Sequence, residues 1–316
     1  MINVSLTEPF KPCDLDRFSD LPGIRVRYEE LFDADVILGT PAPDRICGLQ
    51  KLKWVQSTSA GVDEYMKHKR LFFGRTLTTA SGAFGRSISE YVLAMALALM
   101  KQLPLYRDDQ KAERFADEGR QFSPYGKRLL VFGCGDIGCS AAKIFAPFGC
   151  HAVGVCRNPQ VSREAFEKTV CLAEAEAFLP QADVIVCALP DTAETRGWFH
   201  YERLKRLKPE AILINVGRGS FIDTDALSRA LSEGVLYGAA LDVTDPEPLP
   251  PGHPLWQTPN CLITPHVSGR GFDHLTETTE KIIGICRENL LRYAEGRPLM
   301  NQVDLDLEYR RMEERR

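Results

Sequence analysis

The stretch Leu129-Leu-Val-Phe-Gly-Cys-Gly-Asp-Ile-Gly138 decides the fold of the region around it. Its first four residues have the length and apolarity of a buried strand, and Gly133-Cys-Gly-Asp-Ile-Gly138 matches Gly-x-Gly-x-x-Gly. The first glycine permits a tight turn, the second lets the backbone approach a pyrophosphate, and the third lets a helix pack on the strand. We expect that helix over Cys139–Phe148, with N-terminal amides facing phosphate charge. The segment predicts a dinucleotide site; the alternative is a tight turn without a ligand.

Other apolar runs extend this unit into a doubly wound parallel sheet. Near-continuous apolar runs suit strands that are covered on both faces. The runs after the first strand are Ala152–Val155, Val184–Ala188, Ala211–Asn215, Leu236–Val243 and Cys261–Thr264. Helical segments such as Asp225–Glu233 separate many of them. Asp35–Gly39 and Leu52–Ser57 predict similar strand–helix units near the N-terminus, so the whole chain is expected to be an α/β protein.

Helix and boundary signals divide the chain. Ser87-Ile-Ser-Glu90 has the pattern of a capping box, so we expect a long helix to begin there and Pro104 to limit it. The polar stretch Arg107–Lys127 is expected to mark the boundary before a second domain. Glu280–Glu295 predicts an amphipathic helix, and the charge run Glu308–Arg316 predicts a solvated end.

Three later segments place polar side chains just after predicted strands. Arg218 lies between glycines in Asn215–Ser220, Glu247 lies between prolines, and His266 follows Thr264-Pro265. Ligands of open α/β sheets bind outside the carboxyl ends of the strands, so these residues are expected on the same edge as Gly133–Gly138. Taken singly, each has an ordinary alternative as a helix cap, a loop charge or a turn residue.

The three residue types together match the reduction of a 2-keto acid. A guanidinium such as Arg218 binds a carboxylate through two parallel hydrogen bonds. His266 can donate a proton to the nascent alkoxide, and Glu247 can orient the imidazole and favour its protonated form. The hydride comes from a nicotinamide cofactor, so no protein nucleophile or metal is required. We therefore predict an oxidoreductase acting between NAD(P)H and a small 2-keto or 2-hydroxy acid.

The end of the second strand bears on the choice of cofactor. NAD-binding sites usually have an acidic residue there for the ribose 2′-hydroxyl, but no acidic residue lies between Gly138 and Glu164. The segment instead reads Val155-Cys-Arg-Asn-Pro159, and Arg157 can pair with a 2′-phosphate. This favours NADP, with NAD as the alternative; Arg157 could also be an ordinary solvated residue.

Composition is that of a soluble globular protein. Apolar residues make up 44% and charged residues 26%, and a net charge of -4 does not favour nucleic acid or membrane partners. We expect no signal peptide in Met1–Phe10 and no membrane span in Ile88–Leu103, which is too short. The ten cysteines lack a Cys-x-x-Cys, and several, such as Cys156, lie in apolar runs. That pattern favours free thiols and a cytoplasmic protein.

Taken together, these segments resemble the D-isomer-specific 2-hydroxyacid dehydrogenases. The resemblance extends over nearly the whole chain. The motifs that carry it are Ser59-Ala-Gly-Val-Asp63, the helix Ile88–Leu99, Gly133–Gly138, Leu189-Pro190, Asn215–Ser220, Ala240-Leu-Asp-Val243, Glu247-Pro-Leu-Pro250 and Pro265-His266.

The resemblance implies two Rossmann-like domains with doubly wound parallel sheets, the N-terminal one completed by the C-terminal helix. Residues 1–100 and 286–316 would form the substrate-side domain, and residues 101–285 the dinucleotide-binding domain. A homodimer would form through the second domain, and Arg107–Lys127 would be the arm that takes part in the interface. The substrate would be of the glyoxylate or hydroxypyruvate type. Formate is disfavoured, because formate dehydrogenases of this fold carry glutamine at the position of Glu247. A phosphoglycerate dehydrogenase-like enzyme and a dinucleotide-sensing corepressor remain alternatives on this fold.

The resemblance also assigns roles by position. Arg218 would bind and polarise the substrate, His266 would be the acid/base, and Glu247 would pair with it. Amides near Ala60 and Gly61 would hold the substrate carboxylate. The residues expected to line the cofactor are Gly133, Gly135, Asp136, Ile137, Gly138, Arg157, Asn158, Val216 and Gly217, with Asp242 at the nicotinamide amide.

Overall fold

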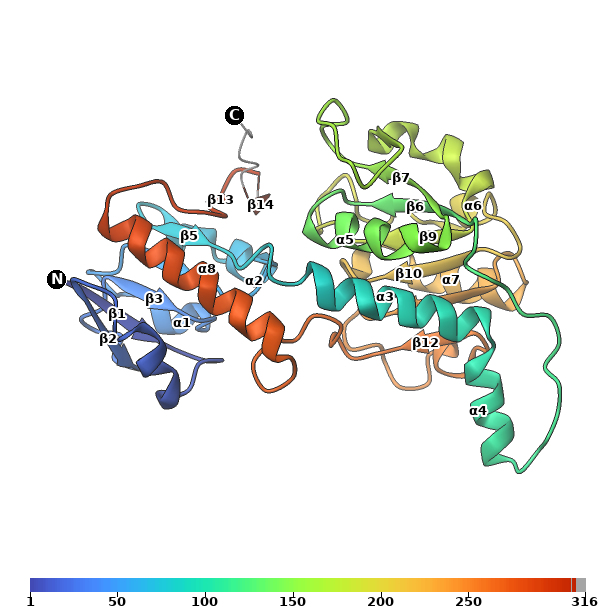
Figure 1. Ribbon diagram of the computed structural model, residues 1–316, viewed down its shortest axis with the longest axis horizontal. Coiled ribbons are helices and arrows are strands. Elements are labelled where there is room, and N and C mark those ends of the chain that lie inside the picture. Colours follow the sequence, from blue (N-terminus) through green and yellow to red (C-terminus); the bar gives the residue numbers. More distant parts are fainter. Residues whose placement is uncertain (308, 311–316) are drawn as a thin grey trace. The chain divides into compact units, whose positions relative to one another are not determined.

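The computed structural model describes residues 1–307 and 309–310 of the 316 in the chain. These residues form two compact units, shown in Figure 1. Unit 1 comprises Met1–Phe84 with the described residues from Arg270 onward, and unit 2 comprises Gly85–Gly269.

Unit 1 is built on a five-stranded sheet with the order β2-β1-β3-β4-β5 and parallel pairing throughout. Its strands are β1 (Ile2–Leu6), β2 (Ile24–Tyr28), β3 (Val36–Leu38), β4 (Trp54–Gln56) and β5 (Thr76–Thr78). Its helical segments are η1 (Pro12–Phe18), α1 (Pro43–Ile46), α2 (Asp63–Lys67), η2 (Lys69–Phe72) and α8 (Thr276–Ala294).

The last helix completes unit 1, as the sequence predicts. The buried Asn289 of α8 donates a hydrogen bond from Nδ2 to Oε1 of Gln56 in β4, at 2.7 Å. On the same pair of elements, the rings of Trp54 and Tyr293 pack with centroids 5.3 Å apart. Segments more than two hundred residues apart in sequence are therefore joined in one core.

Unit 2 is built on a seven-stranded sheet with the order β12-β11-β10-β9-β6-β7-β8, again parallel throughout. Its strands are β6 (Arg128–Phe132), β7 (His151–Val155), β8 (Lys168–Val170), β9 (Val184–Cys187), β10 (Ile212–Asn215), β11 (Gly238–Leu241) and β12 (Cys261–Ile263). Its helical segments are α3 (Gly85–Met100), α4 (Leu103–Lys111), α5 (Asp136–Phe145), η3 (Ala146–Phe148), η4 (Leu172–Gln181), α6 (Tyr201–Leu204), η5 (Gly219–Phe221), α7 (Thr224–Ser232) and η6 (Pro254–Gln257).

The order of strands in unit 2 reverses between β6 and β9. The chain runs outward from β6 to β8 and then returns to β9 on the other side of β6. Ligands of doubly wound sheets bind beyond the carboxyl ends of the strands at such a reversal. The predicted sheet is thus confirmed, and the strand that the sequence analysis did not find is β8. Its exposed Lys168 leaves only a short, half-buried run without the apolar signal of the other strands.

The helix expected from Ser87 begins earlier, at Gly85, so the predicted capping box is wrong. The amide of Gly85 donates to Oδ2 of Asp136, the first residue of α5, at 2.7 Å, while Glu90 pairs with Arg86. A Cβ on Gly85 would lie 2.3 Å from Oδ1 of Asp136, which explains the glycine. The N-terminus of α3 is thus satisfied from a residue distant in sequence.

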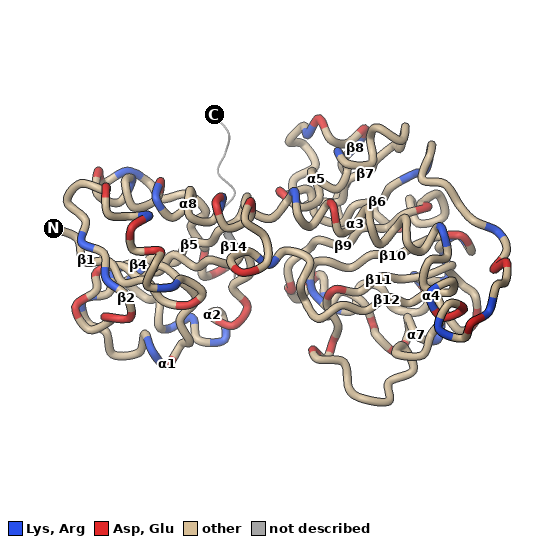
Figure 2. The backbone as a smooth tube through the Cα atoms, turned by 60° about the horizontal axis from the view of Figure 1, so that its bottom comes forward, with Lys and Arg blue, Asp and Glu red and all other residues tan. Residues whose placement is uncertain are grey.

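The limits of the two units differ from the expected boundaries after residue 100 and before residue 286. Since α3 and α5 are joined through Asp136, α3 falls in unit 2 with the Gly-x-Gly-x-x-Gly segment. The polar stretch 107–127, expected to be the boundary, therefore lies inside unit 2. It contains the end of α4 and a long connection that stand away from the sheet (Figure 1), with acidic and basic residues interspersed (Figure 2).

Two further expectations concern a membrane span and the chain end. Among the described residues, no single helix has the length and apolarity of a membrane span; only α3 and α4 together, bent by 65°, reach that length and composition. Part of the charged end 308–316 is described: β14 (Tyr309–Arg310) pairs antiparallel with β13 (Val303–Asp304). The rest of that charge run lies outside the described residues.

Candidate functional site

The turn between β6 and α5 has the geometry of a dinucleotide turn. Gly133 has φ +104°, and a Cβ on it would lie 2.6 Å from the carbonyl oxygen of Ala188 after β9. A Cβ on Gly138 would lie 1.7 Å from the carbonyl oxygen of Gly133, so only glycine lets α5 approach the strand this closely. Gly135, in contrast, is exposed and would meet nothing within 4 Å. Its open face fits the close approach of a pyrophosphate.

The first turn of α5 carries two of the residues predicted to line a cofactor. Ile137 is half-buried beside the turn. The carboxylate of Asp136 accepts the hydrogen bond from the Gly85 amide, so its side chain ties α5 to α3. The structure thus gives Asp136 a structural role that the sequence motif did not indicate.

Beyond β7 lies the segment expected to select between NADP and NAD. Arg157 and Asn158 are both exposed there. Arg163 closes the following turn, because its Nη1 donates to the carbonyl oxygens of Asn158, at 3.2 Å, and Val161, at 2.8 Å. An exposed positive side chain thus lies at the end of β7, where a 2′-phosphate is expected.

Arg218 follows β10 between two glycines that pack against neighbouring backbone. A Cβ on Gly217 would lie 2.7 Å from the carbonyl oxygen of Leu189, and one on Gly219 would lie 2.0 Å from that of Thr244. Asn215, at the end of β10, fixes the loop by donating to the carbonyl oxygen of Arg218 at 2.9 Å and accepting from the Gly217 amide at 3.1 Å. The half-buried Arg218 side chain donates to the carbonyl oxygen of Gly217 at 2.8 Å. Val216 and Gly217 are buried in the same loop.

Asp242 holds the segment that carries His266. Its side chain is buried at 2% exposure, immediately after β11. Oδ1 accepts from the Thr264 hydroxyl at 2.7 Å and the Val267 amide at 2.8 Å, and Oδ2 accepts from the Ser268 amide at 3.0 Å. The Asp242 carbonyl oxygen also accepts from the His266 amide at 2.9 Å. These four bonds hold His266 at φ +53°, a left-handed conformation that is uncommon for residues other than glycine.

A tyrosine from α3 extends this network. The hydroxyls of Tyr91 and Thr264 lie 2.7 Å apart. Thr264 has one hydroxyl proton and directs it to Asp242, so Tyr91 must be the donor to Thr264. Burial raises the pKa of Tyr91 to about 12, which keeps its proton in place. Sequence reasoning missed both residues, because nothing in the sequence indicates a contact across this separation.

The imidazole of His266 meets the carboxylate of Glu247. Nδ1 of His266 lies 2.8 Å from Oε1 of Glu247, and both side chains are about half exposed, at 50% and 45%. Adjacent parallel strands bring these loops together, because Asn215 in β10 is paired with Leu241 in β11, and Leu241 with Ile263 in β12. Arg218, Glu247 and His266 therefore all follow the carboxyl ends of neighbouring strands. The structure brings Glu247 and His266 into direct contact, and the Arg218 loop packs on Thr244 of the Glu247 loop.

Ala60 and Gly61 belong to unit 1, in the turn after β4. The Ser59 hydroxyl shapes the turn by donating to the carbonyl oxygen of Gly61 at 2.6 Å. The Ser59 carbonyl oxygen accepts from the Ala80 amide at 2.9 Å, which ties the turn to the segment after β5. Both predicted substrate residues are half-buried.

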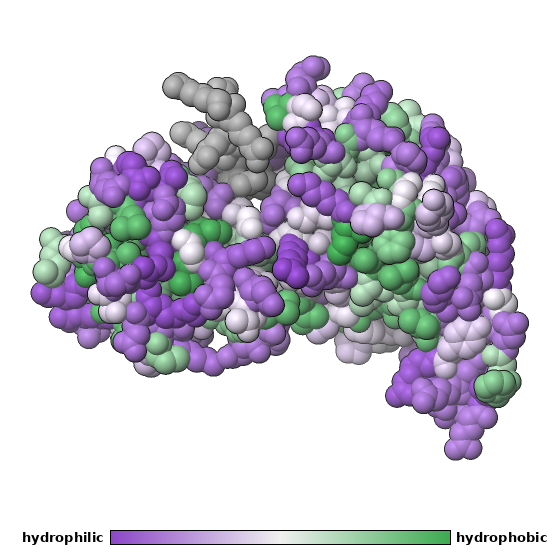
Figure 3. Space-filling model, in the orientation of Figure 1, coloured by the Kyte–Doolittle hydropathy of each residue, from purple (hydrophilic) through white to green (hydrophobic). Residues whose placement is uncertain are grey.

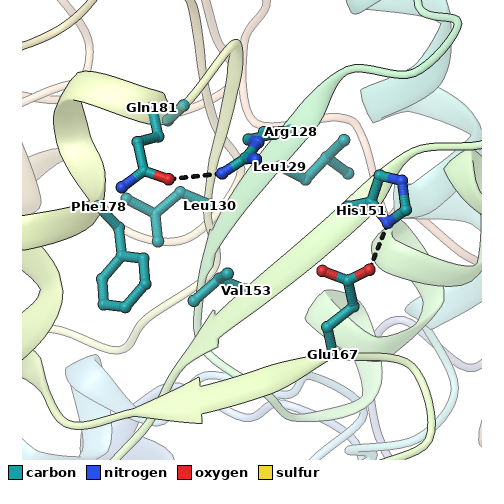
Figure 4. Close-up of a pocket in the computed structure, with 9 residues that line it drawn as sticks. Arg128, Leu129, Leu130, His151, Val153, Glu167, Phe178 and Gln181 are labelled. Atoms are coloured by element: carbon teal, nitrogen blue, oxygen red, sulfur yellow. Dashed lines mark hydrogen bonds and ion pairs between the residues drawn. The ribbon is translucent and has the colours of Figure 1, made fainter.

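A cavity of about 270 Å³ lies elsewhere in unit 2. It is lined by the starts of β6 and β7, including Arg128 and His151, with Phe178 and Gln181 of η4 (Figure 4). The predicted site lies at the carboxyl ends of those strands, so this cavity is at the opposite edge of the sheet. Its polar wall residues pair with each other, Arg128 with Gln181 and His151 with Glu167.

Residues 93–268 match the model of the D-isomer-specific 2-hydroxyacid dehydrogenase NAD-binding domain. The chain belongs to the D-isomer-specific 2-hydroxyacid dehydrogenase family. It is an NAD(P)-dependent oxidoreductase of 2-hydroxy acids, as the sequence motifs predict.

Relatives extend this match over more than nine-tenths of the chain. A glyoxylate/hydroxypyruvate reductase A of Klebsiella pneumoniae is 30% identical over 92% of this chain and 93% of its own length. A family member of Aeromonas salmonicida has a crystal structure 35% identical in sequence, with TM-score 0.85 over 96% of this chain and 99% of that one. The NADPH-dependent glyoxylate/hydroxypyruvate reductase of Sinorhizobium meliloti, in complex with NADP and sulfate, has TM-score 0.82 and 26% identity over 98% and 100%.

Proposed function

We propose that this chain reduces a small 2-keto acid of the glyoxylate or hydroxypyruvate type with NADPH. The observation that carries the proposal is the contact of Glu247 with His266. Glu247 follows β11, and Arg218 follows the adjacent strand β10. The names of the Klebsiella and Sinorhizobium relatives support the substrate type.

His266 is the proposed proton donor. The Glu247 carboxylate accepts a hydrogen bond from the N–H group at Nδ1, which keeps that proton in place. In the imidazolium form, the other ring nitrogen, Nε2, therefore carries the proton that can be transferred. The four bonds to Asp242 fix the backbone from which the imidazole projects. When bound, the nicotinamide supplies the hydride. The protein's part is to hold the substrate carbonyl and deliver the proton to its oxygen.

Arg218 is the proposed anchor of the substrate. Its guanidinium can bind a carboxylate and polarise the adjacent carbonyl, and the packed glycines on either side fix its backbone. We propose that the amides of Ala60 and Gly61 take the rest of the carboxylate, with residues 1–84 and 270–307 acting as the substrate-side unit. The half-buried position of both residues after a strand of unit 1 supports this role.

Cofactor contacts follow the turns of unit 2. Gly133, Gly135 and Gly138 shape the pyrophosphate turn, Ile137 flanks it, and Val216 and Gly217 border the nicotinamide end. Arg157 and Asn158 receive the 2′-phosphate, so NADP is preferred over NAD. The Asp242 carboxylate already accepts three hydrogen bonds, and a carboxylate has about four acceptor positions. Its contact with the nicotinamide amide is thus secondary to its support of the His266 segment. Asp136 has an indirect role in the site, because its carboxylate accepts the hydrogen bond from the Gly85 amide and so holds the N-terminus of α3 against α5.

We propose a homodimer that forms through the arm of unit 2. Phe115 and Tyr125 on this arm are exposed, and such apolar groups are typical of an interface. On the face seen in Figure 3, the arm is mostly hydrophilic with an isolated hydrophobic spot. All ten cysteines are free thiols, which supports a reducing, cytoplasmic location.

Steady-state assays with NADPH or NADH and a panel of 2-keto acids test the proposal. We expect turnover of glyoxylate or hydroxypyruvate with NADPH, and a loss in His266→Ala of about a thousandfold in kcat/KM. His200→Ala, at an exposed histidine elsewhere in unit 2, is the control and should keep full activity. Turnover of only a phosphorylated acid would favour the phosphoglycerate alternative. Cofactor binding without turnover across the panel would favour a dinucleotide-sensing corepressor.

A further inference from the structure

Two thiols lie at the dinucleotide turn, in residues that neither the motif nor the proposed chemistry uses. Cys134 is the residue between Gly133 and Gly135, and Cys156 directly follows β7. The strands that precede them are paired, with Phe132 opposite Val155, and the Gly133 amide donates to the Val155 carbonyl oxygen at 2.8 Å. The two cysteines therefore leave adjacent strands at the same point of the sheet.

A glycine in β7 makes room for the two sulfurs on one face. Side chains two residues apart along a strand point to the same face, so Cys156 shares a face with Gly154. A Cβ on Gly154 would lie 2.4 Å from Sγ of Cys134, which shows that the Cys134 sulfur occupies the space over this glycine. Cys134 is buried there, whereas Cys156 is half-buried.

The two thiols differ in their tendency to ionise. The side-chain hydrogen bond from Cys134 lowers the pKa of Cys156 to about 6, and the positive charge of Arg163 adds to this against the effect of partial burial. Nη1 of Arg163 lies 3.5 Å from Sγ of Cys156. The same hydrogen bond, with burial, raises the pKa of Cys134. Cys156 is therefore a thiolate at neutral pH with a protonated thiol beside it, the arrangement of a reactive cysteine and its resolving partner.

We propose that Cys156 and Cys134 form a reactive dithiol site that hydrogen peroxide or small organic hydroperoxides oxidise to a disulfide, and that this modification prevents dinucleotide binding. The Cys156 thiolate attacks the peroxide, breaks its O–O bond and becomes a sulfenic acid while hydroxide or alkoxide leaves. The Cys134 sulfur then attacks the sulfenic sulfur, the S–S bond forms, and water leaves with the Cys134 proton. Both sulfurs are oxidised and the peroxide is reduced.

Oxidation would act on the cofactor through the backbone of the turn. A disulfide draws the two sulfurs to about 2.05 Å, well inside hydrogen-bonding distance. The peptide units of Cys134, which join the first two glycines of the turn, must move with it, and the pyrophosphate needs their present position. By linkage, a bound dinucleotide should in turn protect the dithiol. This inference rests on the proposed placement of the cofactor at Gly133–Gly138.

The full chain, fully reduced, is treated with hydrogen peroxide in the presence or absence of NADPH. Intact and peptide mass spectrometry should show the loss of two hydrogens in a Cys134–Cys156 crosslink, formed several-fold more slowly with NADPH bound. The Kd for NADPH, followed by its fluorescence, should rise at least about tenfold after oxidation and recover with dithiothreitol. Alkylation of Cys156 by iodoacetamide should accelerate with pH, with a midpoint at about 6.

Variants separate the two thiols. Cys134→Ser should accumulate Cys156 sulfenic acid, trapped by dimedone, without a crosslink. Cys156→Ser should form neither product. Arg163→Gln leaves both thiols in place and should move the alkylation midpoint to higher pH. Cys47→Ser, at an exposed cysteine of unit 1, is the control and should respond to peroxide as the unmodified chain does.

Two failures are distinguishable. Reduced protein that binds NADPH but forms no Cys134–Cys156 crosslink, or that keeps its affinity once crosslinked, overturns the dithiol site. Reduced protein that binds neither NADPH nor NADH instead overturns the proposed cofactor site, whatever mass spectrometry shows for the cysteines.

Discussion

Two segments at the carboxyl edge of the same sheet differ in how they are held. The His266 segment after β12 is tied to the buried carboxylate of Asp242 by three hydrogen bonds. The segment after β7, with Arg157, is mostly exposed, and its backbone carbonyls are bonded to the side chains of Arg163 and Thr169. Proton transfer requires a fixed geometry, whereas a long cation can reach a phosphate from a looser loop. The sheet thus provides rigid support at one position and an adaptable charge at another.

Removing the rigid support should have the largest effect. Asp242→Ala leaves the Thr264 hydroxyl and two amides without their acceptor in a buried place. We expect a loss of at least about 3 kcal/mol in the free energy of unfolding, because three donors lose their acceptor and each unsatisfied buried donor costs about 1–3 kcal/mol. We also expect kcat/KM to fall by at least about a hundredfold as His266 loses its position. Urea denaturation and steady-state kinetics measure the two effects. Asp245→Ala, an exposed neighbour, should change neither; a stable, active Asp242→Ala would show that the segment holds itself.

Changing the charge beside His266 should act on catalysis alone. Glu247→Gln keeps the shape and one acceptor oxygen but removes the negative charge. We expect kcat to fall about tenfold to a hundredfold, since general acid catalysis contributes about 10²–10⁴ in total. Stability should remain within about 1 kcal/mol because the pair is half exposed. Kinetics and thermal melting of the same preparation test this, and an unchanged kcat would remove Glu247 from the mechanism.

The sequence predicted the local parts of this site and missed the parts that join distant segments. A strand, a glycine turn and a helix are adjacent in sequence, so Gly133–Gly138 was interpretable from spacing alone. The acceptor for the N-terminus of α3 is Asp136, which lies far from Gly85 in sequence, so the local pattern at Ser87 predicts the wrong cap. Tyr91 and Thr264 meet only because α3 packs on the sheet at β10 and β11, next to the strand that Thr264 follows. A contact between segments so far apart in sequence leaves no periodic pattern that could predict it.

The looser segment should control the choice of cofactor with a moderate effect. Arg157→Ala removes the proposed partner of the 2′-phosphate. We expect the KM for NADPH to rise at least about tenfold, because a hydrogen bond to a charged group contributes about 1.5–3 kcal/mol and about 1.4 kcal/mol corresponds to tenfold. The KM for NADH, which has no such phosphate, should stay the same and serves as the internal control. Arg157→Lys should lie between, because it keeps the charge but not the planar fork. Equal losses with both cofactors would place Arg157 outside the phosphate site.

The outermost part of the His266 support should have the smallest effect. Tyr91→Phe removes one donor to Thr264, and we expect about 0.5–1.5 kcal/mol less stability with a few-fold lower kcat. Since burial raises the pKa of Tyr91 to about 12, the phenol stays protonated below that pH, and the kcat ratio of the two proteins should be constant across the usual assay range. Thr264→Val should lower both stability and kcat further, because it also removes the hydrogen bond from Thr264 to Oδ1 of Asp242. The Tyr91 hydroxyl acts only through Thr264, so the double variant should lose less activity than the product of the single losses. Fully additive losses would mean that Tyr91 supports α3 rather than the His266 segment.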